Sequence, residues 1–256
     1  MRCYWCFNGK ITRKSLGQGY KNMRNKNILI LGASSDLGIS VTKLLIQKNW
    51  NVFAHCNANS NRLKKINSNK IKIIKINFLK KNINNKIKKL KSYKFDAFLN
   101  LVGFIDNKSF EKFDIDNLVK TLKVNSIIPL LIIKKIIKPM LKQKWGRIIQ
   151  TSSIGVKFGG GKNTFNYSMS KHLNEFVPRD YKDWAKKGLL YNVLRIGTTN
   201  TKIHKKINKK NISKRVALIP QKRMAETIEV ARYIEFLLSE RNTYITGQIL
   251  SISGGE

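Results

Sequence analysis

Tyr167 and Lys171 are the residues whose types and spacing point most directly to acid–base chemistry. They stand four apart in "YSMSKHLNEF" (167–176), a segment with helical spacing, so their side chains share one helix face. An ammonium beside a phenol favours the phenolate and lowers the pKa of the tyrosine, which gives an acid or base suited to near-neutral pH. A pair at this spacing also arises by chance in a lysine-rich chain, so it needs support from elsewhere.

That support comes from two further segments. Ser153 ends the predicted strand "GRIIQTSS", 14 residues before Tyr167. The segment "ILILGASSDLGIS" (28–40) reads as a strand, a turn at Gly32 and a helix packed closely at Gly38. Free backbone amides at such a helix start, together with the helix dipole, can hold a diphosphate. In a parallel sheet, a hydroxyl, a phenol and an ammonium would converge opposite this loop.

The elements that must position these groups alternate between strand and helix patterns, which predicts an α/β fold. Right-handed crossovers make it a doubly wound parallel sheet with helices on both faces. The predicted strands are 27–33, 50–56, 71–78, 94–103, 145–153, 188–197 and 246–255, and the predicted helices are 40–49, 115–143, 167–176 and 225–240. One domain covers residues 26–256. Residues 1–25 read as an N-terminal extension or a mis-called start, since Met23 would open the domain naturally.

The composition is strongly basic, with 51 Lys and Arg against 14 Asp and Glu and a net charge of +37. Nucleic acid, anionic lipid or an acidic protein could attract such a surface. The charge is diffuse, however, and aromatic residues do not interleave with the basic runs, so codon bias toward Lys, Asn and Ile is the favoured explanation. We therefore expect no dedicated nucleic-acid function.

No segment predicts a membrane or metal protein. The apolar run 127–140 is broken by Lys134 and Lys135 and is too short to span a bilayer, and no secretory signal pattern appears. A cytoplasmic location without membrane contact is expected. Cys3 and Cys6 form a CxxC with no second pair or histidine to complete a zinc site, and the three histidines are expected to be structural or surface residues.

Taken in order and spacing, the motifs from about Lys26 to Glu256 resemble those of the short-chain dehydrogenase/reductase family. "GASSDLG" resembles its glycine loop and "NLVG" (100–103) its asparagine-containing turn. "LKVNSIIP" resembles the helix with its catalytic asparagine, "RIGTTNT" (195–201) the turn that embraces the nicotinamide, and "ITGQILSISGG" (245–255) the closing strand. The pattern is similar to 3-oxoacyl-acyl-carrier-protein reductases, and "SKHLNEF" and "RIGTTNTKIHKK" are also similar to reductases found with polysaccharide genes.

This resemblance implies a single-domain Rossmann-type fold and a catalytic tetrad of Asn125, Ser153, Tyr167 and Lys171. Tyr167 would exchange a proton with the substrate oxygen, and Ser153 would hydrogen-bond that oxygen. Lys171 would lower the pKa of Tyr167 and hold the nicotinamide ribose, and Asn125 would anchor a proton-relaying water. The implied cofactor-binding residues are Gly32, Ser34, Ser35, Asp36, Leu37, Gly38, Asn57, Arg62, Asn77, Asn100, Gly103, Tyr167, Lys171, Gly197, Thr199 and Thr201.

Several positions depart from the family pattern. The apolar changes leave the tetrad alone: they are Leu31, Leu101, Val102 and Ile196. Asn77 replaces an aspartate that contacts adenine, which would weaken binding without abolishing it. NAD-specific members carry an acid after the second strand, whereas "AHCNANSNR" (54–62) has none and offers Asn57 and Arg62. We expect NADP(H) to be preferred, with NAD(H) left open.

Two further positions carry specific hypotheses. Asp36 stands where such loops usually have glycine, and we expect it to cap the helix and point away from the pyrophosphate; the alternative is a repulsive contact that weakens cofactor binding. Pro178 interrupts the helix that carries Tyr167. Either that helix bends after Phe176, or the subunit interface differs. We expect the protein to form a homo-oligomer, a dimer or tetramer, and we expect Pro178 to alter this oligomerisation without abolishing it.

The function expected from these residues is the NADP(H)-dependent interconversion of a carbonyl and a secondary alcohol, as in 3-oxoacyl-carrier-protein reductases. The alternative is reduction of a keto-sugar or other polysaccharide precursor. The segment 198–218, which should cover the substrate, is rich in Lys and Asn and favours a polar or anionic substrate. A non-catalytic nucleotide- or nucleic-acid-binding protein is a hypothesis of another class, and the complete tetrad argues against it.

Overall fold

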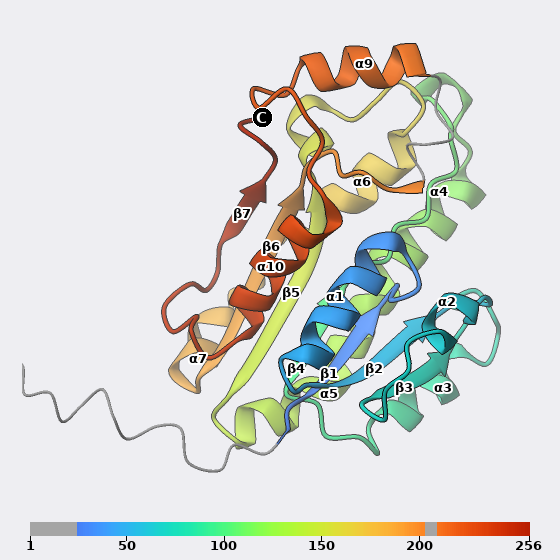
Figure 1. Ribbon diagram of the computed structural model, residues 1–256. Coiled ribbons are helices and arrows are strands. Elements are labelled where there is room, and N and C mark those ends of the chain that lie inside the picture. The colour runs from blue at the N-terminus through green and yellow to red at the C-terminus, as the bar shows by residue number, and fades with distance from the viewer. Residues whose placement is uncertain (1–24, 203–208) are drawn as a thin grey trace, which may run out of the picture.

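Seven strands form one parallel sheet in the order β3-β2-β1-β4-β5-β6-β7 (Figure 1). The computed structural model describes residues 25–202 and 209–256, so the predicted extension, with Cys3 and Cys6, lies almost wholly outside the described residues. The predicted fold class is confirmed, and the predicted strands are confirmed with tighter bounds. They are β1 (Asn27–Leu31), β2 (Asn51–Cys56), β3 (Ile71–Lys75), β4 (Ala97–Asn100), β5 (Gly146–Ser153), β6 (Leu189–Ile196) and β7 (Ile249–Ile252).

Strand composition follows position in the sheet. The central strands β1, β4 and β5 are buried almost throughout, because helices cover both faces. β1 and β4 are mostly apolar, whereas β5 (GRIIQTSS) is buried although it carries several polar residues. The edge strand β3 (IKIIK) carries exposed lysines, and β7 alternates between exposed and half-buried residues. Charge on an edge strand discourages pairing with another chain.

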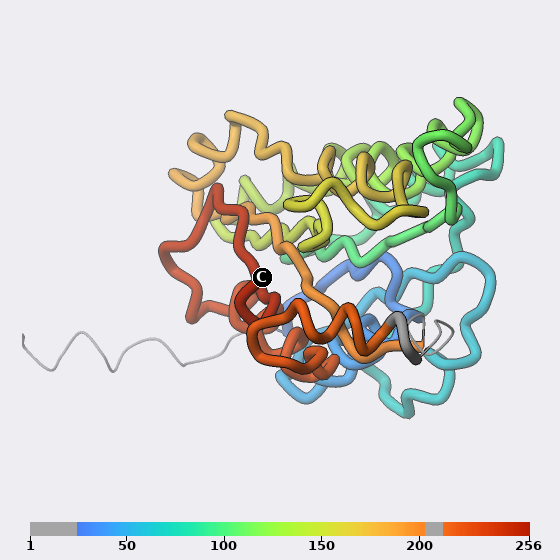
Figure 2. The backbone as a smooth tube through the Cα atoms, turned by 90° about the horizontal axis from the view of Figure 1, so that it is seen from above, coloured from blue at the N-terminus to red at the C-terminus, as the bar shows by residue number. Residues whose placement is uncertain are grey.

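Two helical layers enclose the sheet, as the view from above shows (Figure 2). The helices α1 (Asp36–Gln47) and α10 (Thr227–Leu238) pack together on one face, where Leu45 and Ile234 are fully buried. The other face is covered by α3 (Ile83–Leu90), α5 (Ile128–Lys142) and α6 (Phe165–Leu173). Each fully buried Leu or Ile contributes about 1.5–3 kcal/mol to folding. The other helices of the described residues are α2 (Asn61–Lys64), α4 (Ile115–Leu122), α7 (Tyr181–Lys186) and α9 (Lys209–Ala217), with short 3-10 turns at η2 (Phe110–Lys112) and η4 (Ile154–Phe158).

The long helix predicted over 115–143 is divided in two. Between α4 and α5 lies a π-helical segment, η3 (Lys123–Ile127), which contains the buried Asn125. An inserted π turn re-aims the side chains of a helix, and such turns are frequent at functional sites. Here it turns Asn125 inward, toward the strand ends.

The helix with Tyr167 and Lys171 ends earlier than predicted. α6 stops at Leu173, and α7 begins only at Tyr181, so Pro178 lies in the connection. Of the two alternatives for Pro178, a helix that bends after Phe176 is therefore wrong. The reason is non-local, because the side chain of Asn174 turns toward the sheet and donates to the backbone oxygens of Asn125 (3.2 Å) and Thr151 (3.1 Å).

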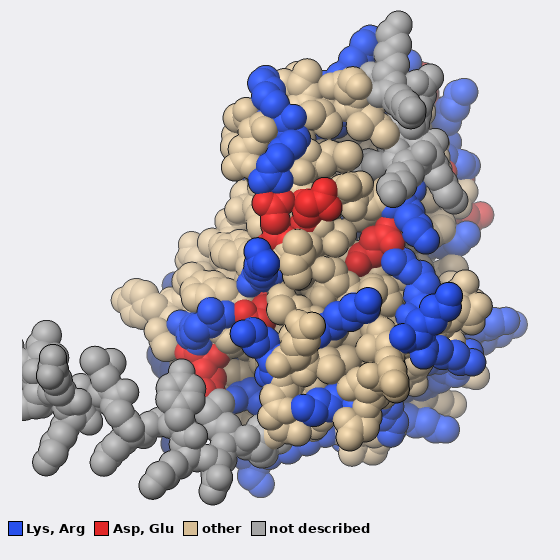
Figure 3. All heavy atoms as spheres, viewed as in Figure 1, with Lys and Arg blue, Asp and Glu red and all other residues tan. Residues whose placement is uncertain are grey.

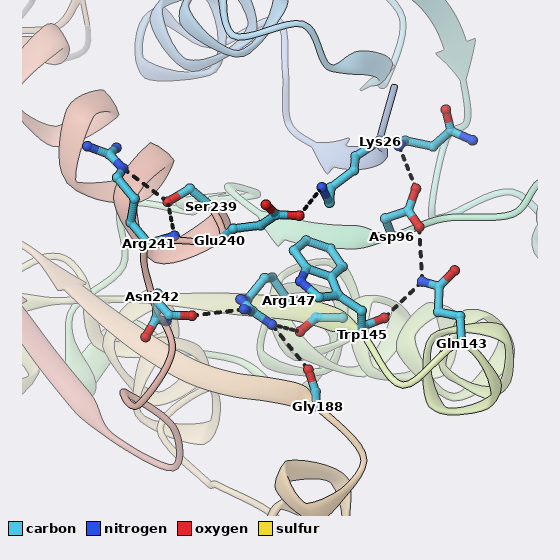
Figure 4. A network of polar contacts seen from close by, with 12 residues as sticks. Lys26, Asp96, Gln143, Trp145, Arg147, Gly188, Ser239, Glu240, Arg241 and Asn242 are labelled. Carbon is cyan, nitrogen blue, oxygen red and sulfur yellow. Dashed lines mark hydrogen bonds and ion pairs between the residues drawn. The ribbon is translucent and has the colours of Figure 1, made fainter. Parts of the chain in front are cut away.

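A polar network closes the amino ends of the strands (Figure 4). Arg147, only 5% exposed, donates to the backbone oxygens of Gly188 (3.1 Å) and Asn242 (2.8 Å) and lies 4.5 Å from the ring of Trp145. Burial lowers the pKa of its guanidinium to about 10. Asp96 accepts from the backbone N–H of Asn27 (2.8 Å). In open α/β sheets, ligands bind at the opposite edge, beyond the carboxyl ends of the strands.

The face of the protein seen in Figure 3 is basic. Lys and Arg side chains are spread over the face seen in Figure 3, with a few acidic groups between them. Within residues 25–202 and 209–256, no helix has the length and apolar character needed to cross a membrane.

Candidate active site

The turn after β1 depends on two glycines. Gly32 has φ +75°, and a Cβ there would lie 2.9 Å from the backbone oxygen of Leu101. A Cβ on Gly38 would lie 2.6 Å from the backbone oxygens of Gly32 and Ala33, so α1 could not pack this closely with any larger residue. The backbone N–H groups of Asp36 and Leu37 belong to the first turn of α1 and have no intrahelical acceptor. This loop can therefore receive an anionic group.

Ser35, and not Asp36, caps α1. Ser35 has extended backbone angles (φ −68°, ψ 165°), and its Oγ accepts from Gly38 N at 3.0 Å. Asp36 is the first helical residue; its Oδ2 accepts from Lys202 N at 2.6 Å and its Oδ1 pairs with Arg62 Nη2 at 2.6 Å. Partial burial raises the pKa of the Asp36 carboxyl, but these two partners outweigh it and hold that pKa below its usual value. The capping prediction is wrong.

His55 supports the same loop from β2. It is 4% exposed, its Nδ1 accepts from Gly32 N at 3.2 Å, its Nε2 lies 2.9 Å from Ile76 O, and its ring stacks on Phe78. An imidazole that accepts at Nδ1 and donates at Nε2 must be neutral. Burial accordingly lowers the pKa of His55 to about 4. The structural role expected for the histidines fits this residue.

Acid should destabilise the protein through His55. Its pKa is about 4 in the folded chain against 6.5 ordinarily, so the unfolded chain binds the proton more readily between these values. Stability is therefore lost as pH falls from about 6.5 to about 4, by on the order of 3 kcal/mol. Urea unfolding at pH 7 and pH 5 should show a flatter pH dependence for His55→Gln than for the wild type. His172→Gln, at an exposed histidine, is the control, and equal slopes for all three proteins would contradict the prediction.

The turn 101–103 joins the glycine loop to α6. The backbone oxygen of Leu101 lies against Gly32, Lys171 Nζ donates to Val102 O at 2.8 Å, and a Cβ on Gly103 would lie 3.6 Å from Tyr167 Cε2. The structure thus brings the predicted glycine loop, the "NLVG" turn and the Tyr–Lys pair to one end of the sheet.

Within this cluster, burial dominates the ionisation of the two α6 residues. Burial raises the pKa of Tyr167 to about 12, although a hydrogen bond with Ser153 opposes the shift. Lys171 is 3% exposed, and burial lowers its pKa to about 7. Its Nζ is directed at the oxygens of Val102 and Thr151 and lies 5.7 Å from the centre of the Tyr167 ring. The expected lowering of the Tyr167 pKa by Lys171 is therefore not found: burial raises that pKa, and the opposing contribution comes from Ser153.

Asn125 and Asn100 form the floor of the cluster. The Asn125 side chain accepts from Phe104 N (2.7 Å) and donates to Ser170 Oγ (2.8 Å), while its backbone oxygen accepts from the amides of Asn100 and Asn174. These contacts tie β4 to α6. They also use the groups of Asn125 that would anchor a water, so its relay role stays a prediction.

An ion pair that the sequence analysis missed fixes the end of α6. Glu175 accepts from Ser152 Oγ (2.8 Å) and from Arg195 through two bonds of 2.6 Å. Partial burial raises the pKa of the Glu175 carboxyl, but the bonds from Arg195 and Ser152 outweigh it and lower that pKa. The spacing in the sequence could have revealed Glu175, because it follows Lys171 by four residues, as Lys171 follows Tyr167. The pair joins α6 to β5 and β6 beside Ser153.

The other predicted residues lie at the same edge. Asn57, exposed, follows β2, and Asn77 follows β3, where its Oδ1 accepts from Leu79 N at 2.8 Å. Thr199 Oγ1 donates to Gly197 O at 3.0 Å after β6, and Thr201 precedes Lys202. Gly197 is needed for packing, since a Cβ there would lie 2.6 Å from Ser253 Cα. Among the described residues, no group of His, Cys, Asp and Glu could hold a metal ion.

Comparison with known proteins agrees with this geometry. A family profile described as "Enoyl-(Acyl carrier protein) reductase" matches residues 32–256. The 3-oxoacyl-[acyl-carrier-protein] reductase FabG of Buchnera aphidicola subsp. Acyrthosiphon pisum is 29% identical over 91% of this chain and 98% of its own. The solved 3-oxoacyl-[acyl-carrier protein] reductase from Brucella melitensis is similar with a TM-score of 0.81 at 19% identity, covering 91% of each chain. The structure "ElxO with NADP Bound" gives 0.78 at 23% identity, covering 90% of this chain and 98% of that one.

The chain therefore belongs to the short-chain dehydrogenase/reductase family. It is an oxidoreductase enzyme of the type to which the 3-oxoacyl-carrier-protein reductases belong.

Proposed function

We propose that the protein is an NADP(H)-dependent reductase of a 3-oxoacyl thioester carried by an acidic carrier protein. The observation that supports it most is the meeting of Ser153, Tyr167 and Lys171 with the glycine loop through the turn 101–103. The similar Buchnera and Brucella proteins bear the name of this activity. A basic surface suits an acidic carrier. A cytoplasmic location belongs to the same proposal.

The residues present fit a dinucleotide. The cradle that a Cβ on Gly32 or Gly38 would fill, and the N–H groups of Asp36 and Leu37, suit its pyrophosphate. Lys171 would hold the nicotinamide ribose. No acid stands between Asn57 and Arg62, and a guanidinium in that stretch suits a 2′-phosphate. ElxO structures with NADP and NADPH bound share the fold. When bound, NADPH supplies the hydride.

The chain's own groups handle the proton. Because burial holds the pKa of Tyr167 near 12, its phenol stays protonated at neutral pH and can donate to the substrate oxygen. Ser153, already hydrogen-bonded to that phenol, would hold the same oxygen. The Lys171 ammonium would stabilise the phenolate that remains. Asn125 and Glu175 hold α6 in place.

A panel of carbonyl substrates tests the substrate class. We expect NADPH oxidation with the highest kcat/KM for acetoacetyl-CoA and a 3-oxoacyl carrier protein, and lower kcat/KM with NADH. The keto-sugar alternative is favoured if only nucleotide-linked keto-sugars react. Salt-sensitive RNA binding without any turnover would favour the non-catalytic alternative, and NADH turnover equal to NADPH turnover would overturn the cofactor preference.

We further propose that the protein is a homo-oligomer whose oligomerisation is altered by the short helix α6. Apolar side chains on the packed helices α4 and α6, and just beyond α6, are exposed: Ile115 (66%), Val119 (52%), Met169 (42%), Leu173 (40%) and Phe176 (70%). Such a surface is typical of an interface between subunits. Size-exclusion chromatography with light scattering should give a dimer or tetramer, and only monomer would overturn this proposal.

A further inference from the structure

The Asp36 carboxylate joins three segments that are far apart in the sequence. It accepts from Lys202 N at 2.6 Å, just after the 195–201 turn, and it pairs with Arg62 of α2 at 2.6 Å. Arg62 is placed across the glycine loop by a second bond, from its Nη1 to Ser34 O at 3.1 Å. The side chains of Asp36 and Arg62 are 18% and 39% exposed, so this ion pair is partly shielded from water.

The position of this carboxylate conflicts with the binding of an anion. It belongs to the first turn of α1, whose free N–H groups are the ones proposed for the pyrophosphate. Its partners hold its pKa below the usual value, so it is charged at neutral pH. It also engages Arg62, the cation proposed for the 2′-phosphate. A phosphate that approaches this loop must therefore overcome one negative charge and take over donors that the charge already occupies.

We propose that Asp36 is a specificity-determining residue that acts as an internal competitor of the cofactor phosphates. It holds Arg62 and the Lys202 amide, and it yields them when a dinucleotide with a 2′-phosphate binds. This inference rests on the proposed function and deepens it. NAD(H) has no group that could take Arg62 from Asp36, so the competition concerns NADP(H) in particular.

A double-mutant cycle separates competition from a supporting role. If Asp36 competes for Arg62, then Asp36→Asn should tighten NADPH binding, and Arg62→Met should cost more affinity in the Asp36→Asn background than in the wild type. If Asp36 instead orients Arg62 for the cofactor, then Asp36→Asn should weaken NADPH binding, and the cost of Arg62→Met should shrink in that background.

Isothermal titration with NADPH, NADH and 2′,5′-ADP measures the cycle on the full chain. We expect Asp36→Asn to bind NADPH and 2′,5′-ADP about tenfold more tightly, with a smaller gain for NADH. Asp183→Asn is the matched control, because it removes an exposed carboxylate paired with Lys186 and should change nothing. Circular dichroism and thermal unfolding verify that each variant folds.

The outcomes distinguish a failure of the inference about Asp36 from a failure of the proposed NADP(H)-dependent function. Wild-type binding of NADPH together with unchanged or weaker binding by Asp36→Asn overturns the inference and leaves the proposed function standing. Absence of NADPH binding in both proteins overturns the proposed function and the inference with it. Binding gained only in Asp36→Asn supports the competition directly.

Discussion

Replacing Tyr167 by Phe will lower kcat for reduction of a 3-oxoacyl thioester by about 10² to 10⁴-fold, because the variant lacks the proton donor. The dissociation constant for NADPH should change far less than kcat, since only the hydroxyl of Tyr167 is removed and the other residues proposed to bind the cofactor remain. The buried phenol has a pKa raised to about 12, so at neutral pH the wild type presents almost entirely the proton-bearing form.

Steady-state kinetics and NADPH titration on the same preparations give the two readouts. Tyr244→Phe is the control, because Tyr244 is 94% exposed and should tolerate the change without effect. Retention of wild-type kcat by Tyr167→Phe would remove Tyr167 from the chemistry. Loss of NADPH binding together with kcat would show that the substitution damages the site and not only the proton transfer.

Replacing Lys171 by Met will have an effect of similar size, of about 10² to 10⁴-fold on kcat/KM. Burial lowers the pKa of Lys171 to about 7 from 10.5, so the ammonium form is present below that pH and is lost above it. If the ammonium stabilises the phenolate and holds the ribose, wild-type kcat/KM for reduction must fall as the pH rises through about 7. Lys171→Met should be slow at every pH and lack this step.

The measurement is the kcat/KM of each protein between about pH 5.5 and about pH 9, a range that brackets the pKa of Lys171 at about 7. Lys186→Met, at an exposed lysine, controls for loss of positive charge and should keep the wild-type profile. A wild-type profile that is flat or rises through pH 7 contradicts the assigned role. Lys171→Met also leaves the oxygens of Val102 and Thr151 without their donor, so its folding is verified by circular dichroism.

The sheet could be predicted from the sequence because its signals are local. Apolar runs marked the central strands β1 and β4. Gly32 and Gly38 marked the turn after β1, where a Cβ at either position would collide with the backbone. The short helices α2, α3, α7 and α9 were not predicted. For α3 the signal was present, because Ile83, Ile87 and Leu90 recur at helical spacing and are buried on one face.

What could not be predicted depends on contacts between distant residues. Ser35 and Asp36 are both good capping residues, and only the backbone angles in the fold decide that Ser35 is the cap. Pro129 has no N–H to bond the backbone oxygen of Asn125, but the π turn itself forms only where that oxygen accepts from Asn100 and Asn174. Likewise, α6 ends where Asn174 reaches the sheet. The pairing of Asp36 with Arg62 and the support of Gly32 by His55 likewise arise only when β1, β2 and α2 come together.

Hydride transfer can be followed directly. NADPH carrying deuterium at both C4 positions of the nicotinamide is incubated with acetoacetyl-CoA and enzyme, and the product is analysed by mass spectrometry. We predict deuterium at the carbinol carbon of 3-hydroxybutyryl-CoA with the wild type, and almost none over the same time with Tyr167→Phe. Binding of NADPH without deuterium transfer to this thioester or to a 3-oxoacyl carrier protein would contradict the proposed function.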